Sequence, residues 1–466
     1  MPATPITLGD LRRSEHRVQP IKAELRRNLM RKLASGEALF PGIRGYDDSV
    51  IPQLENAILA GQDIVLLGER GQAKSRLNRA LTSLLDDALP VIAGCEINDN
   101  PYEPICRRCR DLVSELGDAT PVAWLGPEQR FSEKLATPDT SIADLIGEVD
   151  PIRVAEGRYL SDELTIHYGL IPRTNRGIFA INELPDLAER IQVGLLNIIE
   201  ERDVQIRGYR LRLPLDVFVV ATANPEDYTN RGRIITPLKD RFGAQVRTHY
   251  PRTLEDEIAI AEQERTVFDE MPVPVTMPGF MKEIVAEISH VARRHAQVNQ
   301  RSGVSVRVST ANYENLVSNA LRRALLTGER EAVARVSDLP ALTSSTAGKI
   351  ELETWEDSDD GAVLEKLVKT ATNNVFRRHF TVQEFQDLVQ RFDRGGFTVE
   401  VGDGLAVGAY TQALAELKGI DRARQKLEEP DTEGMRIAVL ELVLEGLHLG
   451  KRLNKTVLDG SSVYGG

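Results

Sequence analysis

The sequence is poor in cysteine and in aromatic residues, with 3 Cys, 2 Trp and an aromatic fraction of 5% among 466 residues. A small fold held together by disulfides is therefore excluded, because such folds are dense in cysteine. No apolar run approaches the length that crosses a bilayer, and the N-terminus has no apolar signal core. We therefore expect a soluble cytoplasmic protein with no membrane segment.

The chain also lacks an excess of positive charge, since its formal net charge at pH 7 is -12. General nucleic-acid binding is not expected, because neutralising phosphates requires concentrated Lys and Arg. The length allows two or three domains, each with a hydrophobic core of its own. A hydrophobic fraction of 41% is typical of such globular domains.

The three cysteines, Cys95, Cys106 and Cys109, lie close together in the sequence. Cys106 and Cys109 have the two-residue spacing of a metal-binding knuckle, but the nearest histidine is His167 and a fourth ligand is missing nearby. We therefore expect no stoichiometric zinc, and reduced thiols on a surface insertion are the simplest interpretation. Bound zinc and a redox-sensing pair are the alternatives.

Residues 61–77 are the stretch around which the chain is organised. The run from Ile64 to Leu67 predicts a buried strand, and a Gly-containing turn then leads into a helical pattern near Lys74. In a phosphate-binding loop of this layout, backbone N–H groups face the phosphates, a Lys adds positive charge and a Ser hydroxyl holds magnesium. The expected nucleotide-binding residues are Gly68, Glu69, Arg70, Gly71, Gln72, Ala73, Lys74 and Ser75, with Ala73 in place of the usual Gly.

Two further apolar stretches predict buried strands that end in polar residues. Residues 178–181 lead into Asn182 and Glu183, and residues 217–223 lead into Asn224. Ligands of a parallel sheet bind at the carboxyl ends of its strands, so we expect these side chains beside the phosphates. Strands that alternate with helices predict an α/β fold with a parallel sheet.

The character of the sequence changes along the chain. Residues 11–34 predict one helix with an apolar stripe, whose basic residues form a solvated face or, alternatively, dock a partner. After residue 253 the patterns are helical, and the acidic stretch 351–360 predicts a solvated linker. The expected segments are an N-terminal helical extension (1–37), an α/β nucleotide-binding domain (38–252), a helical lid domain (253–345), an acidic linker (346–362) and a mainly helical C-terminal extension (363–466).

These motifs, in this order, resemble an AAA+ ATPase, and most closely the ATPase (I) subunit of magnesium chelatase and its MoxR-type relatives. The resemblance covers roughly residues 38 to 340. The matching segments are 68–75 for Walker A, 175–184 for Walker B, 221–226 for sensor 1, 237–243 for the arginine-finger stretch and 302–307 for sensor 2. Segments 148–170 and 204–213 lie where these relatives carry a helix 2 insert and a hairpin before sensor 1.

The resemblance implies catalytic roles for three residues. Glu183 would polarise the attacking water, Asn224 would contact that water or the γ-phosphate, and Arg241 would act on the ATP of a neighbouring subunit. Each has a simpler alternative. Glu183 would be a helix N-cap, Asn224 a strand terminator, and Arg241 a partner of Asp240 or Asp216 in an ion pair.

ATP and Mg²⁺ are the implied cofactors. Arg307 would contact phosphate from the same subunit, or else be a solvated side chain. Ser75 and Asn182 would lie at the magnesium ion. The chelatase relatives have Asp where this chain has Asn182, and the loss of that charge weakens a magnesium site without removing every ligand.

The sequence thus predicts an ATP-hydrolysing motor that forms a homo-oligomeric ring, with a hexamer as the expected size. By resemblance, it would remodel or load a partner with a von Willebrand factor A domain. Magnesium chelatase activity itself is not expected, because that reaction needs two further subunits. A nucleotide-binding scaffold without turnover is the alternative suggested by Asn182 and Ala73. An enhancer-dependent transcription activator is a further one, which the absence of a GAFTGA loop opposes.

Overall fold

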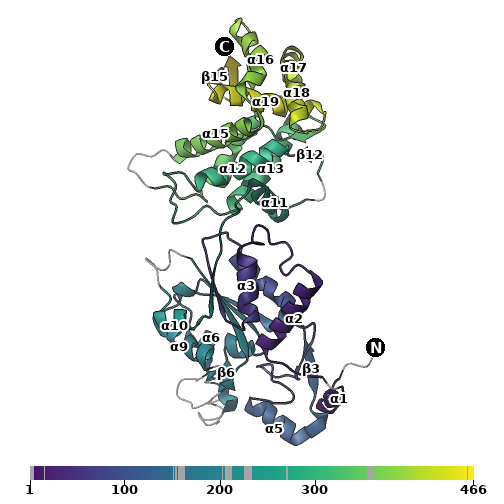
Figure 1. The fold of residues 1–466 in the computed structure, drawn as a ribbon, viewed down its shortest axis with the longest axis vertical. Coiled ribbons are helices and arrows are strands. Elements are labelled where there is room, and N and C mark those ends of the chain that lie inside the picture. The colour runs from purple at the N-terminus through teal and green to yellow at the C-terminus, as the bar shows by residue number, and fades with distance from the viewer. Residues whose placement is uncertain are drawn as a thin grey trace. The chain divides into compact units, whose positions relative to one another are not determined.

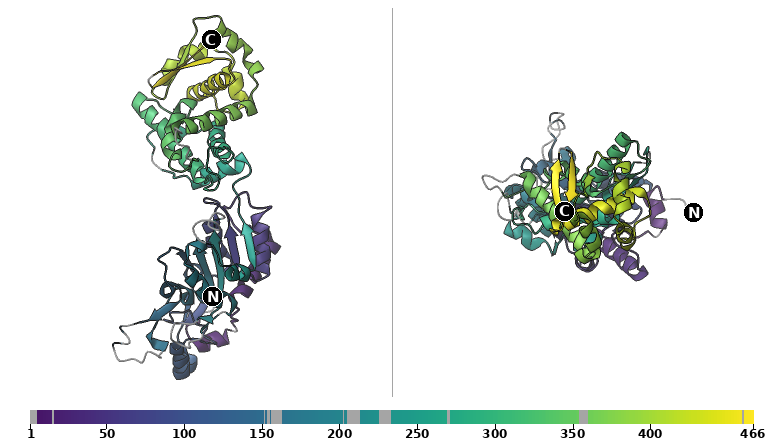
Figure 2. Two further views of the ribbon diagram at one scale, coloured as in Figure 1. Left: turned by 90° about the vertical axis from the view of Figure 1, so that its left-hand side faces the viewer. Right: turned by 90° about the horizontal axis from the view of Figure 1, so that it is seen from above.

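The computed structural model describes residues 5–14, 16–150, 152, 155, 163–201, 203–204, 213–224, 233–268, 271–353, 360–458 and 460–466. The chain divides into two compact units, Met1–His249 and Tyr250–Gly466 (Figures 1 and 2). We describe each unit by itself. The finer division into five segments stays a prediction.

The first unit is built on a five-stranded parallel sheet with the strand order β11-β1-β10-β7-β4. The strands are β1 (Ile64–Leu67), β4 (Phe131–Leu135), β7 (Gly177–Asn182), β10 (Val217–Ala223) and β11 (Ala244–Arg247). Every neighbouring pair runs parallel. The three central strands are continuous apolar runs, as burial of both sheet faces requires. The predicted α/β fold with a parallel sheet is confirmed.

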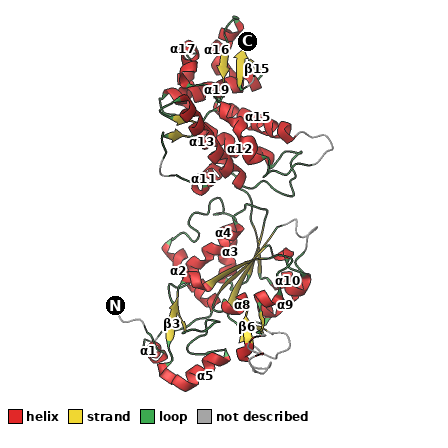
Figure 3. Cartoon of the chain, turned by 180° about the vertical axis from the view of Figure 1, so that it is seen from behind, coloured by secondary structure: helices red, strands yellow, loops and turns green. Residues whose placement is uncertain are grey.

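Helices cover both faces of this sheet (Figure 3). Side chains alternate between the faces of a strand, so Ile64 and Leu66 of β1 enter one hydrophobic core while Val65 and Leu67 enter the other. The helices of the first core are α2 (Ile21–Ser35), α3 (Val50–Leu59) and α4 (Lys74–Ala80), and those of the second include α9 (Glu189–Glu200) and α10 (Thr236–Arg241).

The predicted N-terminal helix over residues 11–34 is wrong in its extent. The structure has two helices there, α1 (Leu8–Arg13) and α2, and Pro20 stands directly before α2. Proline is disfavoured inside a helix because it removes an N–H donor and clashes with the preceding turn. Of the apolar stripe, Ile21, Leu25 and Leu29 are buried, whereas Leu33 is 45% exposed.

A buried ion pair fixes α2 to the sheet. The Arg130 guanidinium pairs with the Glu24 carboxylate, with 2.6 Å between Arg130 Nη2 and Glu24 Oε2, and both side chains are almost fully buried. Arg130 also donates to the Arg176 carbonyl oxygen at 2.8 and 3.0 Å. The basic N-terminal helix is therefore part of the first unit's packing and not a free appendage.

The cysteine-bearing insertion has regular secondary structure. Strand β2 (Leu89–Ile92) pairs antiparallel with β3 (Val122–Leu125) in a separate two-stranded sheet. Between these strands lie the cysteine-bearing loop and α5 (Arg107–Leu116). The helix predicted to begin near Lys74 is α4, which ends at Ala80 and is followed by a 3-10 turn at Leu81–Leu84.

Some predicted features fall on residues outside the described ranges. Of the expected hairpin at 204–213, the structure describes only its ends, which belong to the antiparallel pair β8 (Asp203–Val204) and β9 (Leu213–Pro214). Within 148–170, strands β5 (Gly147–Val149) and β6 (Ile166–Tyr168) pair antiparallel, and most residues between them lie outside the description. Residues 225 and 226 of the sensor 1 segment and residues 354–359 of the acidic stretch also lie outside it.

The second unit is mainly helical, as predicted. Most of its helices contribute to one large hydrophobic core, and a smaller cluster includes Val304, Val308 and Leu367. The described helices are α11 (Leu254–Glu264), α12 (Gly279–Ala292), α13 (Arg307–Thr327), α14 (Thr343–Thr346), α15 (Asp360–His379), α16 (Gln386–Asp393), α17 (Thr411–Glu416), α18 (Ile420–Lys426) and α19 (Glu433–Leu449). A small antiparallel sheet that the sequence analysis does not predict lies beside α19 (Figure 2), formed by β14 (Val399–Val401), β15 (Asn454–Leu458) and β16 (Ser461–Gly465). Among the described residues, no helix combines the length and apolarity that a membrane crossing requires.

Candidate functional site

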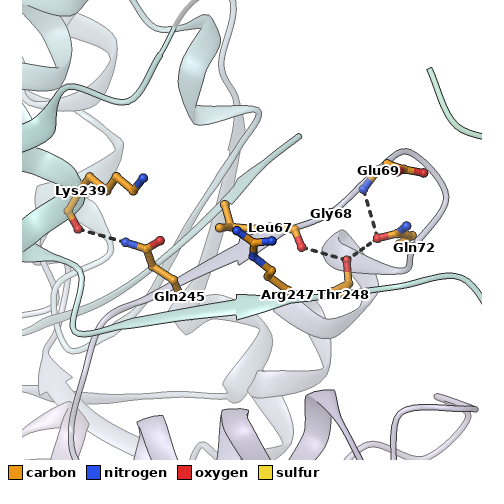
Figure 4. A pocket seen from close by; sticks show the side chains of 8 residues that line it. All are labelled: Leu67, Gly68, Glu69, Gln72, Lys239, Gln245, Arg247 and Thr248. Atoms are coloured by element: carbon orange, nitrogen blue, oxygen red, sulfur yellow. Dashed lines mark hydrogen bonds between the residues drawn. The ribbon is translucent and has the colours of Figure 1, made fainter. Parts of the chain in front are cut away.

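The phosphate-binding loop connects β1 to α4 at the carboxyl edge of the sheet. A Cβ added at Gly68 would lie 1.8 Å from Thr248 Oγ1, so only glycine fits there. The Gln72 side-chain oxygen accepts hydrogen bonds from the Glu69 N–H at 3.1 Å and from the Thr248 hydroxyl at 2.7 Å (Figure 4). The loop is thus held in shape by β11 and by its own side chains.

The backbone of this loop is left-handed at two positions. Gly71 has φ +77° and Ala73 has φ +54°. A left-handed conformation costs a non-glycine residue about 1–2 kcal/mol, because Cβ approaches the following carbonyl oxygen. The usual Gly before the Lys is therefore explained by backbone shape, and Ala73 adopts the same shape under strain.

Tyr46 supports the loop from the segment before α3. Its hydroxyl lies 2.9 Å from the Gln72 carbonyl oxygen and 2.8 Å from the His249 carbonyl oxygen. Burial raises the pKa of Tyr46 to about 12, so the hydroxyl keeps its proton and serves as a donor at neutral pH. No motif in the sequence indicates this role of Tyr46.

Lys74, Asn224 and Glu183 form a hydrogen-bonded chain across three elements. Lys74 Nζ donates to the carbonyl oxygens of Gly68 and Glu69, the latter at 2.9 Å, and to Asn224 Oδ1 at 2.7 Å. Asn224 Nδ2 in turn donates to Glu183 Oε2 at 2.9 Å. The structure therefore brings together the three predicted side chains that start α4 and end β10 and β7.

Glu183 stands in a strained conformation immediately after β7. Its φ is +54°, and its N–H donates to the Thr222 hydroxyl on β10 at 3.0 Å. Strained residues of this kind persist where the surrounding structure determines them, and they concentrate at functional sites. The half-buried carboxylate is thereby directed to Asn224 and not to the backbone of the following turn, as a simple helix cap would be.

Asn182 is buried next to a carboxylate that the sequence analysis does not identify. Its side-chain nitrogen donates to the Glu133 carboxylate, which also accepts from Arg79 Nε at 2.8 Å. Glu133 lies on β4, the edge strand that pairs with β7. An acidic group on the neighbouring strand thus contacts Asn182, which stands where the resemblance leads us to expect Asp. Sequence spacing gives no signal for it, because the contact depends on the register of β4.

Arg241 is the last residue of α10 and is engaged in a salt bridge. Its guanidinium pairs with Glu200 of α9 at 2.9 Å and with Asp240 at 3.2 Å. The hydrogen bond to Glu200 raises the pKa of Arg241 further above its usual value. Of the two expected alternative partners, Asp240 is found, whereas Asp216 accepts from the Ile21 N–H at 2.8 Å. The side chain is 36% exposed, so it remains accessible from outside the unit.

The remaining predicted residues are exposed. Arg70 lies at the tip of the loop and Ser75 in the first turn of α4. Arg307 begins α13 in the second unit, and its side chain is exposed there.

A cavity of about 380 Å³ opens beside the loop. It is lined by Leu67, Gly68, Glu69, Gln72, Lys239, Gln245, Arg247 and Thr248 (Figure 4). The lining includes two cationic side chains, Lys239 and Arg247, as well as the glycine-containing turn. The backbone N–H groups of the loop and these two cations form a donor set that suits a phosphate. Lys74 does not line the cavity but donates to the Gly68 and Glu69 carbonyl oxygens of the same loop.

Comparisons with known proteins find magnesium-chelatase subunits among the similar sequences. The magnesium-chelatase subunit ChlI of Nostoc sp. is 25% identical over 372 residues, which cover 75% of this chain and 91% of that protein. ChlI of Synechocystis sp. is 26% identical over 357 residues, which cover 71% and 93%. A solved complex of the magnesium-chelatase subunits BchI and BchD aligns with 76% of this chain and all of that chain at 17% identity. Its TM-score of 0.32 is too low to bear on function. No protein-family model matches the chain.

The parallel sheet and its phosphate-binding loop are those of the α/β AAA+ P-loop fold, and the similar sequences are magnesium-chelatase subunits. Within that class, the chain resembles the ATPase (I) subunit of magnesium chelatase. The predicted resemblance is confirmed.

Proposed function

We propose that this chain hydrolyses ATP as a ring-forming motor and uses the energy to remodel or load a partner protein. The observation that carries the proposal is the hydrogen-bonded chain Lys74–Asn224–Glu183. It joins the cation that binds phosphate, the amide that contacts the reacting end and the carboxylate that activates water. A protein that only binds nucleotide has no need of this connection.

Each residue has a physical task in this proposal. Lys74 and the loop N–H groups bind and orient the phosphates, and Glu183 holds and polarises the attacking water. Asn224 fixes Glu183 in the conformation that faces the loop. Bound ATP supplies the phosphoryl group, and Mg²⁺ neutralises charge on its β- and γ-oxygens.

We assign the magnesium site to Ser75 and Asn182, and we add Glu133 because its carboxylate accepts a hydrogen bond from the Asn182 amide. Asn182 offers a neutral oxygen, and Glu133, held through the Asn182 amide and Arg79, supplies the negative charge nearby. Carboxylate, hydroxyl and amide oxygens are suitable ligands for Mg²⁺ or for its bound waters. The residues present therefore fit the ion, although the charge comes from a neighbouring strand.

The proposed ring depends on Arg241 and Arg307. Arg241 would reach the ATP of the adjacent subunit, with Glu200 as the residue that positions it, and Arg307 would contact phosphate from its own subunit. By resemblance to the chelatase subunits, a hexamer is the proposed assembly. A protein with a von Willebrand factor A domain is the proposed partner.

One observation favours a second function, a nucleotide-binding scaffold with little turnover. Asn182 carries no charge, so the magnesium site is weaker than one built on Asp. We favour the motor, because Glu183, Asn224 and Arg241 would serve no purpose in a scaffold.

ATP turnover by the purified full chain separates the two. Glu183→Gln should still bind ATP but lose turnover by about 100-fold or more, whereas Glu189→Gln on the exposed start of α9 should match the wild type. Lys74→Ala should weaken ATP binding at least tenfold, about 1.4 kcal/mol, in calorimetric titration. Wild-type turnover equal to that of Glu183→Gln at saturating Mg²⁺, with and without partner, would establish the scaffold.

A further inference from the structure

The loop between β2 and α5 gathers all three cysteines of the chain and one aspartate. One ligand atom from each of Cys95, Asp99, Cys106 and Cys109 lies within 4.8 Å of the others. Asp99 and Cys109 are fully buried, Cys106 is 6% exposed, and all three thiols are free. The expectation of a missing fourth ligand is wrong, because it considered His and overlooked the carboxylate between the cysteines.

One oxygen of this aspartate lacks a partner. Asp99 Oδ2 accepts a hydrogen bond from the Cys106 N–H at 3.0 Å. Asp99 Oδ1 is buried and has no hydrogen-bond partner within the described part of the chain. Leaving a carboxylate oxygen unsatisfied in a protein interior is unfavourable, and such atoms are rare in native structures. A cation among the four groups would satisfy it.

Backbone N–H groups orient two of the sulfur atoms. The Cys106 sulfur caps α5 and lies 3.4 Å from the Cys109 N–H, and the Cys95 sulfur lies 3.4 Å from the Asp99 N–H. Such backbone contacts hold the two sulfur atoms in place, as outer contacts do around metal ligands.

The backbone around the cluster is shaped and anchored. Gly94 has φ +69° and Asn98 has φ +52°, and these turns fold the loop back so that Cys95 and Asp99 face α5. The Arg176 guanidinium donates to the Pro90 carbonyl oxygen at 2.8 Å and to that of Asn98 at 3.4 Å. Its positive charge stands against the same loop and offsets part of the negative charge of the four groups.

We propose that Cys95, Asp99, Cys106 and Cys109 bind one Zn²⁺ ion. Tetrahedral Zn²⁺ with Zn–S bonds of about 2.3 Å places its sulfur ligands about 3.8 Å apart, which fits within the observed spread. Three thiolates exclude Mg²⁺ and Ca²⁺, which take oxygen ligands. A four-iron cluster is larger than a single ion, so its ligand atoms must lie farther apart than the four atoms of this site do.

The ion would be structural. Four protein ligands close a zinc site and leave no open position for chemistry. Asn175 and Arg176, which hold the loop, precede β7, whereas Glu183 follows its other end. The cluster therefore stabilises the β2–α5 module at the edge of the sheet opposite the phosphate-binding loop.

The first test is the metal content of the full chain, purified under reducing conditions without added metal and without a polyhistidine tag. We expect one zinc per chain by mass spectrometry. Metal-free protein, prepared with a thiol-directed mercurial and then reduced, should bind one Co²⁺ with the visible bands of tetrahedral coordination and near-ultraviolet thiolate charge transfer. A chain that arrives without zinc and also fails to bind Co²⁺ overturns the proposal.

The second test separates a metal ligand from a simple hydrogen-bond acceptor. Asp99→Asn keeps the shape of the side chain and can still accept from the Cys106 N–H, so a hydrogen-bonding role alone leaves Zn²⁺ affinity unchanged. We expect the affinity to fall at least tenfold in competition with a chromophoric chelator. Asp111→Asn, an exposed substitution on α5, is the matched control and should retain wild-type affinity.

Two other results would also overturn the site. If the isolated chain contains iron and shows the broad visible absorption of an iron–sulfur cluster, the site is a redox centre and not a zinc site. A Cys106–Cys109 disulfide in the freshly isolated chain, found by mass spectrometry without reduction, would replace it by a thiol switch. If variants fail to fold, the wild-type measurements still decide between these outcomes.

Discussion

Ala73 adopts the left-handed backbone conformation of the phosphate-binding loop although it is not glycine, and this conformation is strained. We expect Ala73→Gly to retain ATP binding and to raise the free energy of unfolding of the first unit by about 0.5–1 kcal/mol, because it relieves the left-handed strain while adding flexibility to the unfolded chain. Urea denaturation measures this. Ala80→Gly, at φ -65°, is the control and should destabilise by about as much. Equal destabilisation by both changes would show that Ala73 is unstrained.

Glu133 allows a prediction about magnesium. We expect Glu133→Gln to raise the Mg²⁺ concentration for half-maximal ATP turnover by about tenfold, about 1.4 kcal/mol, because it removes the carboxylate beside Asn182. The exposed Glu128→Gln is the control. The double variant Asn182→Asp, Glu133→Gln should recover the wild-type requirement.

Asn182→Asp alone should lower the Mg²⁺ concentration for half-maximal turnover only modestly. The new carboxylate stands beside that of Glu133, and the two negative charges repel each other. An unchanged requirement in Glu133→Gln would place the magnesium charge elsewhere.

At the residue scale, prediction from sequence succeeded where a motif fixes the spacing. Lys74, Glu183 and Asn224 each follow or begin an element that the apolar pattern reveals, and the structure joins them. Glu133 and Asp99 escape such reasoning. Their contacts depend on a strand register and on two left-handed turns, neither of which has a periodic signature.

At the scale of elements, burial decides what the sequence reveals. The central strands β1, β7 and β10 are buried on both faces and appear as unbroken apolar runs. Edge strand β4 has partly exposed residues and reads Phe-Ser-Glu-Lys-Leu, so it resembles a loop. The small sheet of β14, β15 and β16 is missed for the same reason, because β15 is largely exposed.

Helix α10 carries the element-scale prediction. Because Arg241 stands at its exposed end, Arg241→Ala should keep ATP binding and lose turnover if the finger acts on a neighbouring subunit. Mixing this variant with Glu183→Gln should restore part of the turnover, at interfaces where an intact Glu183 meets an intact Arg241. Light scattering confirms that the mixed rings form. No recovery at any mixing ratio would argue against action between subunits.

At the scale of the whole molecule, the main hydrophobic core of the second unit contains residues of both the predicted lid and the predicted C-terminal extension. Helix α12 packs on α15, where Arg378 pairs with Glu283 at 3.0 Å and Asn374 donates to Glu287 at 2.8 Å. A chain that ends at residue 345 loses α15 and α19 and leaves Phe280, Ile284 and Ile288 without cover.

We expect this truncated chain to lose the unfolding transition of its second unit and to become protease-sensitive after residue 250, because that apolar face has no other partner. The fragment 250–466 is the control and should unfold cooperatively. Differential scanning calorimetry and limited proteolysis measure both. A truncated chain that keeps a folded region over 253–345 would show that the predicted lid is an independent domain.

The hydrogen bonds of Lys74 affect how tightly the site binds a nucleotide. Any phosphate that takes this ammonium competes with three protein oxygens, one of which is Asn224 Oδ1. The measured affinity is therefore the difference between two sets of bonds and lies below the intrinsic affinity of the loop. When Lys74 turns to a phosphate, the Asn224 side-chain oxygen loses this donor while its amide nitrogen stays bonded to Glu183. Phosphate at the loop is therefore linked to the Glu183 carboxylate through one amide side chain.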